Sequence, residues 1–186
     1  MSPWRDFDHS AWIERAASSC ADADRRWAVT FHRAGGHPSA LFVLRIVSRL
    51  GDGILWYAFI IALPVVYGWS GWPCSLQMIT AGAFNLLIYL CLKHGIGRSR
   101  PYMDCPDIRA GARALDRFSF PSGHALHAVA YAIILSHHYP QLTLALWAFV
   151  ALVAASRVAL GLHYPSDVVA GGMIGAAVAA IILAWP

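Results

Sequence analysis

Long apolar runs alternate with short polar stretches through most of this chain. Each run approaches the length of about 20 mostly apolar residues that an α-helix needs to cross a bilayer. The five apolar segments lie at about 53–70, 75–93, 122–138, 141–156 and 167–185. The pattern therefore predicts an all-α protein, a polytopic membrane helical bundle of about five transmembrane helices.

The first 50 residues follow a different pattern. Residues 1–37 are polar and highly charged, which is typical of amphipathic helices lying in the membrane interface; an unstructured tail is the alternative. The tryptophans of this stretch are Trp4, Trp12 and Trp27. Residues 38–52 hold a short apolar run that Arg45 and Arg49 interrupt, so an approach helix is expected there, or a sixth span if it crosses. We expect an N-terminal amphipathic region, 1–50, and a transmembrane domain, 51–186.

Composition supports a membrane location. Charged residues make up 13% of the chain, against about 25% in soluble domains, and hydrophobic residues make up 58%. No basic run is interleaved with aromatic residues, so nucleic acid is not expected as a partner. The four cysteines lack metal-site spacing, and no acidic cluster suits Mg²⁺, so neither a metal nor another cofactor is expected. A cleavable signal peptide is not predicted, because Asp6, Asp8 and Glu14 interrupt the N-terminus.

Three short polar islands interrupt the apolar sequence. They read Lys93-x6-Arg100-Pro101, Pro121-Ser122-Gly123-His124 and Ser156-Arg157-x5-His163-x3-Asp167. Together they supply cations, histidines and a carboxylate, which suits binding a phosphate and attacking its phosphorus. Taken singly, Lys93 could be a snorkelling anchor, Arg100 a topology-determining loop charge and Arg157 the mark of a helix end. Their position beside two histidines favours a phosphate site.

The second and third islands predict specific local chemistry. Ser122 is a good N-cap and Gly123 allows backbone to approach a ligand, so a helix start with free N–H groups is expected there. Such a start attracts anions, and His124 adds a titratable group; an ordinary capped helix is the alternative. Asp167, four positions after His163, can accept its Nδ1 proton and leave Nε2 as a nucleophile. A buried structural His–Asp pair is the alternative.

The three islands resemble the signature of the type 2 phosphatidic acid phosphatase (PAP2) superfamily, which reads KxxxxxxRP, PSGH and SRxxxxxHxxxD. Every defining position is present and in order, and the resemblance covers roughly residues 50–180. The apolar spans place the chain with the membrane lipid phosphatases of that family, rather than with its soluble acid phosphatases or vanadium haloperoxidases. Membrane members often have six spans, whereas five are expected here.

The resemblance implies a role for each island residue. His163 would be the nucleophile that forms a phosphohistidine, and Asp167 would orient it. His124 would protonate the leaving oxygen and later activate water. The phosphate oxygens would be held by Lys93, Arg100, Ser122, Gly123 and Arg157. Phosphoryl transfer needs mainly positioning and charge stabilisation, which fixed cations supply without a metal.

The expected activity is hydrolysis of a phosphomonoester or diphosphate on a membrane lipid. Phosphatidate, phosphatidylglycerophosphate, isoprenyl and polyprenyl phosphates are the candidate substrates. A lipid phosphotransferase using the same intermediate and a non-catalytic lipid-binding membrane subunit are the alternatives. The Gly171-x3-Gly175 spacing allows close helix approach, which would serve either a homodimer or packing within the chain.

The positive charges indicate an orientation in the membrane. In the five-span arrangement all 14 Lys and Arg residues fall on one side, together with the three islands. The positive-inside rule assigns that side to the cytoplasm. We therefore expect an integral protein of a bacterial inner membrane with its active site facing the cytoplasm.

Overall fold

The computed structural model describes the backbone of residues 9–185 and the side chains of residues 18–185. Within those limits the chain forms helices and connecting segments, with no strand, which confirms the all-α prediction. The interfacial location expected of residues 1–37 stays a prediction, and all of Trp4 and the side chain of Trp12 lie outside the described residues.

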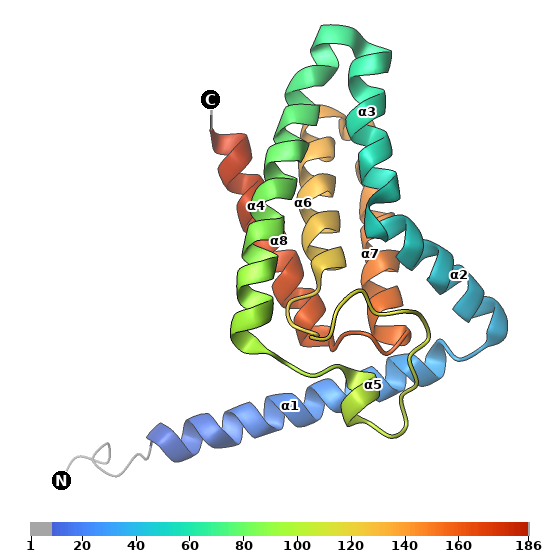
Figure 1. Ribbon diagram of the computed structural model, residues 1–186, viewed down its shortest axis with the longest axis vertical. Coiled ribbons are helices and arrows are strands. Elements are labelled where there is room, and N and C mark those ends of the chain that lie inside the picture. The colour runs from blue at the N-terminus through green and yellow to red at the C-terminus, as the bar shows by residue number, and fades with distance from the viewer. Residues whose placement is uncertain (1–8, 186) are drawn as a thin grey trace.

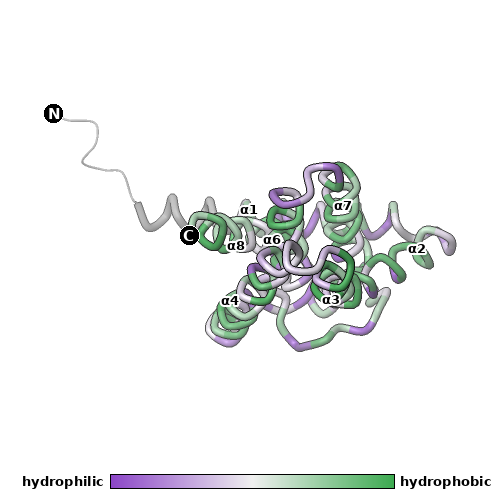
Figure 2. Tube along the Cα trace, turned by 90° about the horizontal axis from the view of Figure 1, so that it is seen from above, coloured by the Kyte–Doolittle hydropathy of each residue, from purple (hydrophilic) through white to green (hydrophobic). Residues whose placement is uncertain are grey.

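The body of the molecule is a bundle of helices that stand side by side (Figure 1). They are α3 (Leu55–Tyr67), α4 (Trp72–Ile96), α6 (Gly123–His138), α7 (Thr143–Ala159) and α8 (Pro165–Ala184). Each coincides with one of the predicted apolar segments. Seen from above, α6 lies among the other helices of the bundle, and much of their length consists of hydrophobic residues (Figure 2). Helices satisfy their own backbone hydrogen bonds, so such a bundle is suited to lipid.

Two helices continue beyond the residues at which the apolar pattern predicted their ends. α4 runs past Lys93 to Ile96, and α7 runs past Ser156 to Ala159, so Arg157 lies inside a helix rather than in the corner that follows. Glycines with left-handed backbone follow both ends, Gly97 with a φ of 63° and Gly161 with a φ of 70°. A charge does not stop a helix, whereas a left-handed glycine allows the chain to leave it.

The closest helix packing in the bundle is between α6 and α8, and it depends on two glycines. A Cβ on Gly175 would lie 2.1 Å from the carbonyl oxygen of Leu126, and one on Gly171 would lie 2.5 Å from that of Ser122. Both distances are impossible for real atoms, so no larger residue fits without separating the helices. The small-residue spacing therefore serves packing within the chain, and a homodimer stays a prediction without support from this motif.

Three stretches of the described chain are long and apolar enough to cross a membrane. They are Pro38–Asp104, which contains both α3 and α4, then Pro140–Ala159 and Pro165–Ala184. The central helix α6 has 16 residues, short of the roughly 20 that a full crossing takes. The five predicted segments are thus all helical, while the number that cross the bilayer stays a prediction.

The N-terminal region forms two helices that lie at an angle to the bundle (Figure 1). α1 (His9–Ala34) is a single helix that runs crosswise at one end, and α2 (Pro38–Arg49) approaches the bundle from the side. A π-helical turn (Leu50–Ile54) joins α2 to α3, and Gly53 breaks the helix there with a φ of 124°. The expected approach helix is therefore present and distinct from α3.

Candidate active site

The three polar islands come together at the end of the bundle nearest to α1 (Figure 1). They surround a cavity of about 490 Å³. The predicted site residues that line it are Lys93, Arg100, Gly123, His124, Arg157 and His163. The remaining two, Ser122 and Asp167, are fully buried and do not line the cavity. The fold therefore brings all eight predicted residues to one site, six at the cavity wall and two buried behind that wall.

His163 lies in the corner between α7 and α8 with its ring almost fully buried. Its Nδ1 lies 2.7 Å from the carbonyl oxygen of Ser119. A carbonyl oxygen only accepts, so Nδ1 carries the proton and Nε2 keeps its lone pair. Burial, reinforced by the positive charges of Arg157, Arg100 and Lys93, holds the pKa of His163 well below its usual range. The site therefore presents a neutral imidazole with an unprotonated Nε2.

The acceptor for His163 is not the one that the sequence suggested. Asp167 Oδ2 lies 3.9 Å from His163 Nδ1, which is beyond hydrogen-bond reach. That oxygen instead accepts from the backbone N–H of Tyr164 at 2.8 Å and so caps α8. The backbone carbonyl of Ser119 orients His163 in place of the carboxylate. The prediction of a direct bond was wrong, because the start of α8 competes for the same oxygen.

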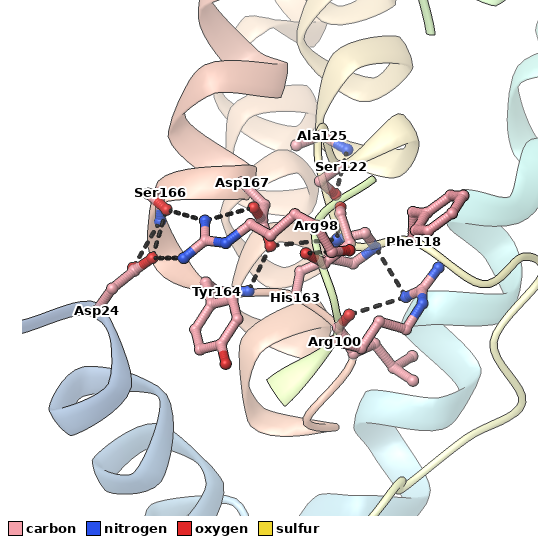
Figure 3. Close-up of polar contacts among 12 residues, drawn as sticks. Asp24, Arg98, Arg100, Phe118, Ser122, Ala125, His163, Tyr164, Ser166 and Asp167 are labelled. Carbon is pink, nitrogen blue, oxygen red and sulfur yellow. Dashed lines mark hydrogen bonds and ion pairs between the residues drawn. The ribbon is translucent and has the colours of Figure 1, made fainter. Parts of the chain in front are cut away.

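The other Asp167 oxygen faces Arg98, which connects the corner to α1 (Figure 3). Arg98 donates to Asp167 Oδ1 at 2.8 Å and to Asp24 Oδ2 of α1 at 2.6 Å. Asp24 also accepts from the backbone N–H of Ser166 at 3.0 Å. The guanidinium of Arg98 lies over the ring of Tyr164, 4.2 Å from its centroid. Asp167 thus acts as an anchor of the corner that carries His163.

Two of the three predicted phosphate-binding cations are paired with a carboxylate from the loop that follows α5 (Pro101–Asp104). Asp116 Oδ1 lies 2.9 Å from Lys93 Nζ and 2.9 Å from an Arg100 terminal nitrogen. Tyr89 donates its hydroxyl to the other oxygen of Asp116. Lys93 and Arg100 are almost fully buried, so this end of the cavity binds an oxyanion, here supplied by the chain itself.

The charge of Asp116 is secured by its neighbours. Burial alone would raise the pKa of this carboxyl, but hydrogen bonds from Tyr89 and Lys93 and the charge of Arg100 hold it below its usual range. The Arg100 terminal nitrogen that does not face Asp116 donates to the carbonyl of Leu162 at 2.8 Å and lies 3.5 Å from His163 Nε2. The nucleophile and the oxyanion site are therefore direct neighbours.

The third cation, Arg157, is held from α2. It is almost fully buried and donates to the hydroxyl of Ser48, while its Nε has no hydrogen-bond partner among residues 18–185. Buried polar atoms are nearly always paired, so an unpaired arginine N–H at a cavity wall indicates room for a ligand.

The second island forms the helix start that the sequence predicted. Ser122 is the N-cap of α6 and its Oγ lies 3.5 Å from the backbone nitrogen of Ala125. A Cβ on Gly123 would lie 2.8 Å from the ring of Tyr89, so a larger residue there would have to displace that ring. His124 follows in the first turn and its Nε2 contacts the carboxylate of Asp52, from the π-helical turn before α3.

The cavity continues from this polar end into an apolar channel between α3 and α4. Trp56, Tyr57 and Ile60 line it on one side, and Ile79, Ala83 and Leu86 line it on the other. Tyr57 and Leu86 are more than half exposed at the outer surface of the bundle, with exposed fractions of 63% and 51%. The site is therefore amphipathic, with a cationic end and an apolar side that opens toward the surroundings of the helices.

Known proteins resemble this chain both in sequence and in architecture. The PAP2 superfamily model matches residues 74–186. A Mycobacterium tuberculosis protein named decaprenylphosphoryl-5-phosphoribose phosphatase is 39% identical over 103 residues, which cover 55% of this chain and 56% of that protein. Its Mycolicibacterium smegmatis counterpart is 34% identical and is matched over 73% of each chain. The chain thus spans little more than half of the first relative's length.

Solved structures agree. The crystal structure of Aquifex aeolicus LpxE superposes with a TM-score of 0.76 at 25% identity, covering 86% of this chain and 94% of that one. A transmembrane PAP2-type phosphatidylglycerolphosphate phosphatase from Bacillus subtilis superposes with a TM-score of 0.70 at 25% identity, covering 90% and 85%. The chain belongs to the PAP2 superfamily. It is an integral membrane protein of that family.

The sequence interpretation missed four side chains that shape this PAP2 site. Asp52, Arg98, Asp116 and Asp24 were not assigned to it, although each contacts a residue of the islands or anchors one that does. For Asp52 a signal existed, because the carboxylate lies between two glycines at the start of an apolar segment. Asp116 and Arg98 resemble ordinary loop charges in the sequence, and the Ser119 carbonyl leaves no side-chain signal at all.

Proposed function

We propose that this PAP2 protein hydrolyses a phosphomonoester or diphosphate on a membrane lipid through a phosphohistidine on His163. The observation that carries the proposal is the arrangement around Nε2 of that residue. An unprotonated, buried imidazole nitrogen lies 3.5 Å from an Arg100 nitrogen, at an oxyanion site that opens into an apolar channel. A nucleophile, a phosphate site and a place for a lipid chain therefore share one cavity.

The bond changes follow from the positions of the two histidines. His163 Nε2 attacks phosphorus, and the bond between phosphorus and the lipid oxygen breaks. His124 donates a proton to that leaving oxygen, and Asp52 beside it stabilises the charged imidazolium beforehand. His124 then takes a proton from water, which attacks phosphorus and breaks the P–N bond. Lys93, Arg100 and Arg157 stabilise the negative charge of the equatorial oxygens in both steps.

The Asp116 carboxylate has a place in this sequence as an exchangeable anion. Lys93 and Arg100 cannot serve Asp116 and a phosphate with the same donors at once. We infer that the substrate phosphate displaces Asp116, and that the carboxylate returns when inorganic phosphate leaves. A dianionic phosphate competes well with a single carboxylate because charge-assisted hydrogen bonds grow stronger with charge.

The decisive experiment compares the purified wild type with His163→Ala on phosphatidate, phosphatidylglycerophosphate, farnesyl phosphate and farnesyl diphosphate, with EDTA present. Loss of the nucleophile is expected to abolish phosphate release to the limit of detection, while the wild type stays active in EDTA. Phosphate release by His163→Ala would contradict the mechanism. Transfer of phosphate to an added lipid alcohol instead of water would favour the phosphotransferase alternative.

The membrane orientation of the site is a separate proposal. The 14 Lys and Arg residues favour a cytoplasmic site by the positive-inside rule. In the five-span arrangement the C-terminus lies on the opposite side. A reporter fused to the C-terminus is then expected to report a non-cytoplasmic location in bacteria, and a cytoplasmic signal would overturn the five-span arrangement.

A further inference from the structure

A second, smaller cavity adjoins the first on the side of α2. Its volume is about 180 Å³, and its wall includes Arg45 and Arg49 of α2 and Arg113 of the loop after α5. We refer to these three residues and the cavity between them as the arginine groove. It shares Asp52, Leu115 and Arg157 with the main cavity, so the two spaces are contiguous at the active site.

The arginine groove carries more positive charge than its own carboxylate balances. Asp52 is 3.8 Å from Arg49 but is also the partner of His124. Arg45 uses its Nε for the carbonyl of Gly111 at 2.7 Å. Its terminal nitrogens, and the whole guanidinium of Arg113, have no hydrogen-bond or ion-pair partner within residues 18–185. Several donors thus remain free to bind an anion.

The wall between the two cavities holds the strongest indication of a ligand. Arg157 is 3% exposed, lines both spaces and leaves its Nε unpaired within the described side chains. A buried arginine that borders two cavities can bind oxygens on both sides, because its guanidinium presents several donors in a fixed plane. A ligand with two anionic groups would use this geometry fully.

We propose that the arginine groove binds a second phosphate group of the substrate, next to the one that His163 attacks. This inference rests on the proposed function and adds a substrate class to it: lipids that carry two phosphate groups close together, as a diphosphate or as a monoester joined to a phosphodiester. The scissile phosphate occupies the Asp116 site, and the second phosphate contacts Arg157 from the other side and reaches Arg45 and Arg113.

Matched substrate pairs in neutral detergent micelles test this inference. One pair is phosphatidate and phosphatidylglycerophosphate with identical acyl chains; the other is farnesyl phosphate and farnesyl diphosphate. In the Arg45→Gln/Arg113→Gln double variant, kcat/KM for the two-phosphate member should fall about tenfold, because two partly exposed charge contacts are lost. For the one-phosphate member we expect a change of less than about twofold.

Arg117→Gln provides the matched control, because Arg117 belongs to the same loop, is exposed and does not line either cavity. Its substrate ratio is expected to equal that of the wild type. The inference would be overturned if the double variant kept the wild-type ratio of kcat/KM between the two members of a pair, or lost activity equally on both. If equal losses appeared only in anionic vesicles, the arginines would bind the headgroups of the bilayer instead. A wild type that releases phosphate from none of the four lipids would instead overturn the proposed function.

Discussion

Two carboxylates of this site, Asp167 and Asp116, are held in opposite ways. Asp167 is fully buried at the start of α8, where a backbone N–H and Arg98 bind its oxygens away from the cavity. Asp116 lies on a loop, its side chain is 29% exposed, and its partners are the cations that line the cavity. The partners of Asp167, Arg98 and the Tyr164 backbone, do not line the cavity, whereas those of Asp116 are the groups that a phosphate needs. Asp167 thus holds the structure of the site in place, whereas Asp116 occupies the position that a phosphate takes.

Removing the charge of Asp167 is expected to have the largest effect. Asp167→Asn removes one of the two buried carboxylates that pair with Arg98 and leaves Asp24 as the other. Breaking a buried ion pair costs about 3 to 5 kcal/mol. We expect a clearly lower melting temperature in detergent and a loss of kcat of about 100-fold, because the corner that positions His163 loses its anchor. Thermal unfolding and phosphate release measure the two effects.

Arg98→Gln distinguishes an anchoring role from a direct one. If Asp167 acts through Arg98, both single variants lose comparable activity and the double variant loses little more, since the two residues form one unit. Full activity in Arg98→Gln beside an inactive Asp167→Asn would show that Asp167 acts on His163 directly, and would break the contrast with Asp116.

Asp52 tests an intermediate case, a carboxylate that lines the cavity but is fixed next to a helix. Asp52→Asn removes the negative charge beside His124. An opposite charge favours the protonated form of an imidazole, so we expect kcat to fall about 30-fold, within the range of general acid–base contributions. The alkaline limb of the pH profile should move to lower pH. An unshifted profile with the same loss of kcat would indicate a purely structural role.

The sequence allowed the islands to be predicted but not the groups that arrange them. His163, His124 and the three cations were found because ionisable residues are rare beside apolar segments, so each is conspicuous. Ser119 was not, because a backbone carbonyl leaves no side-chain pattern. Asp167 was found with the wrong partner, since a spacing of four residues also suits a helix cap, and only the three-dimensional path of the corner decides between them. Asp116 is distant from Lys93 in the sequence, and only the fold of its loop brings the two side chains together.

Asp116→Asn is expected to change binding more than catalysis. The amide keeps the size of the side chain but competes less well for Lys93 and Arg100. Inorganic phosphate and vanadate should therefore inhibit the variant about tenfold more strongly, by the loss of about 1.4 kcal/mol of competition, while kcat changes less than about threefold. Inhibition constants from steady-state kinetics measure this effect.

Asp107→Asn is the control for Asp116, because Asp107 lies in the same loop with a side chain 67% exposed and pairs with Arg33 outside the cavity. Its inhibition constants should match those of the wild type. Weaker phosphate inhibition in Asp116→Asn would mean that the carboxylate positions the cations rather than occupying their ligand site, and Asp116 would then belong with Asp167.

The smallest expected effect concerns the acid limb of the pH profile, which should depend on His163 and not on Asp116. The pKa of His163 is lowered, so its imidazole stays neutral as pH falls through about 6.5, where an ordinary histidine becomes protonated. The pKa of Asp116 is lowered too, so its charge also persists through this range. The acid limb of kcat at saturating substrate should therefore lie below about pH 6.5 and should be the same in wild type and Asp116→Asn. The second pKa of the substrate phosphate is also about 6, so this pKa must be measured separately by phosphorus NMR. If the acid limb lies at the ordinary histidine position after that correction, water reaches His163. The anchor formed by Asp167 and Arg98 would then not keep the corner closed to solvent.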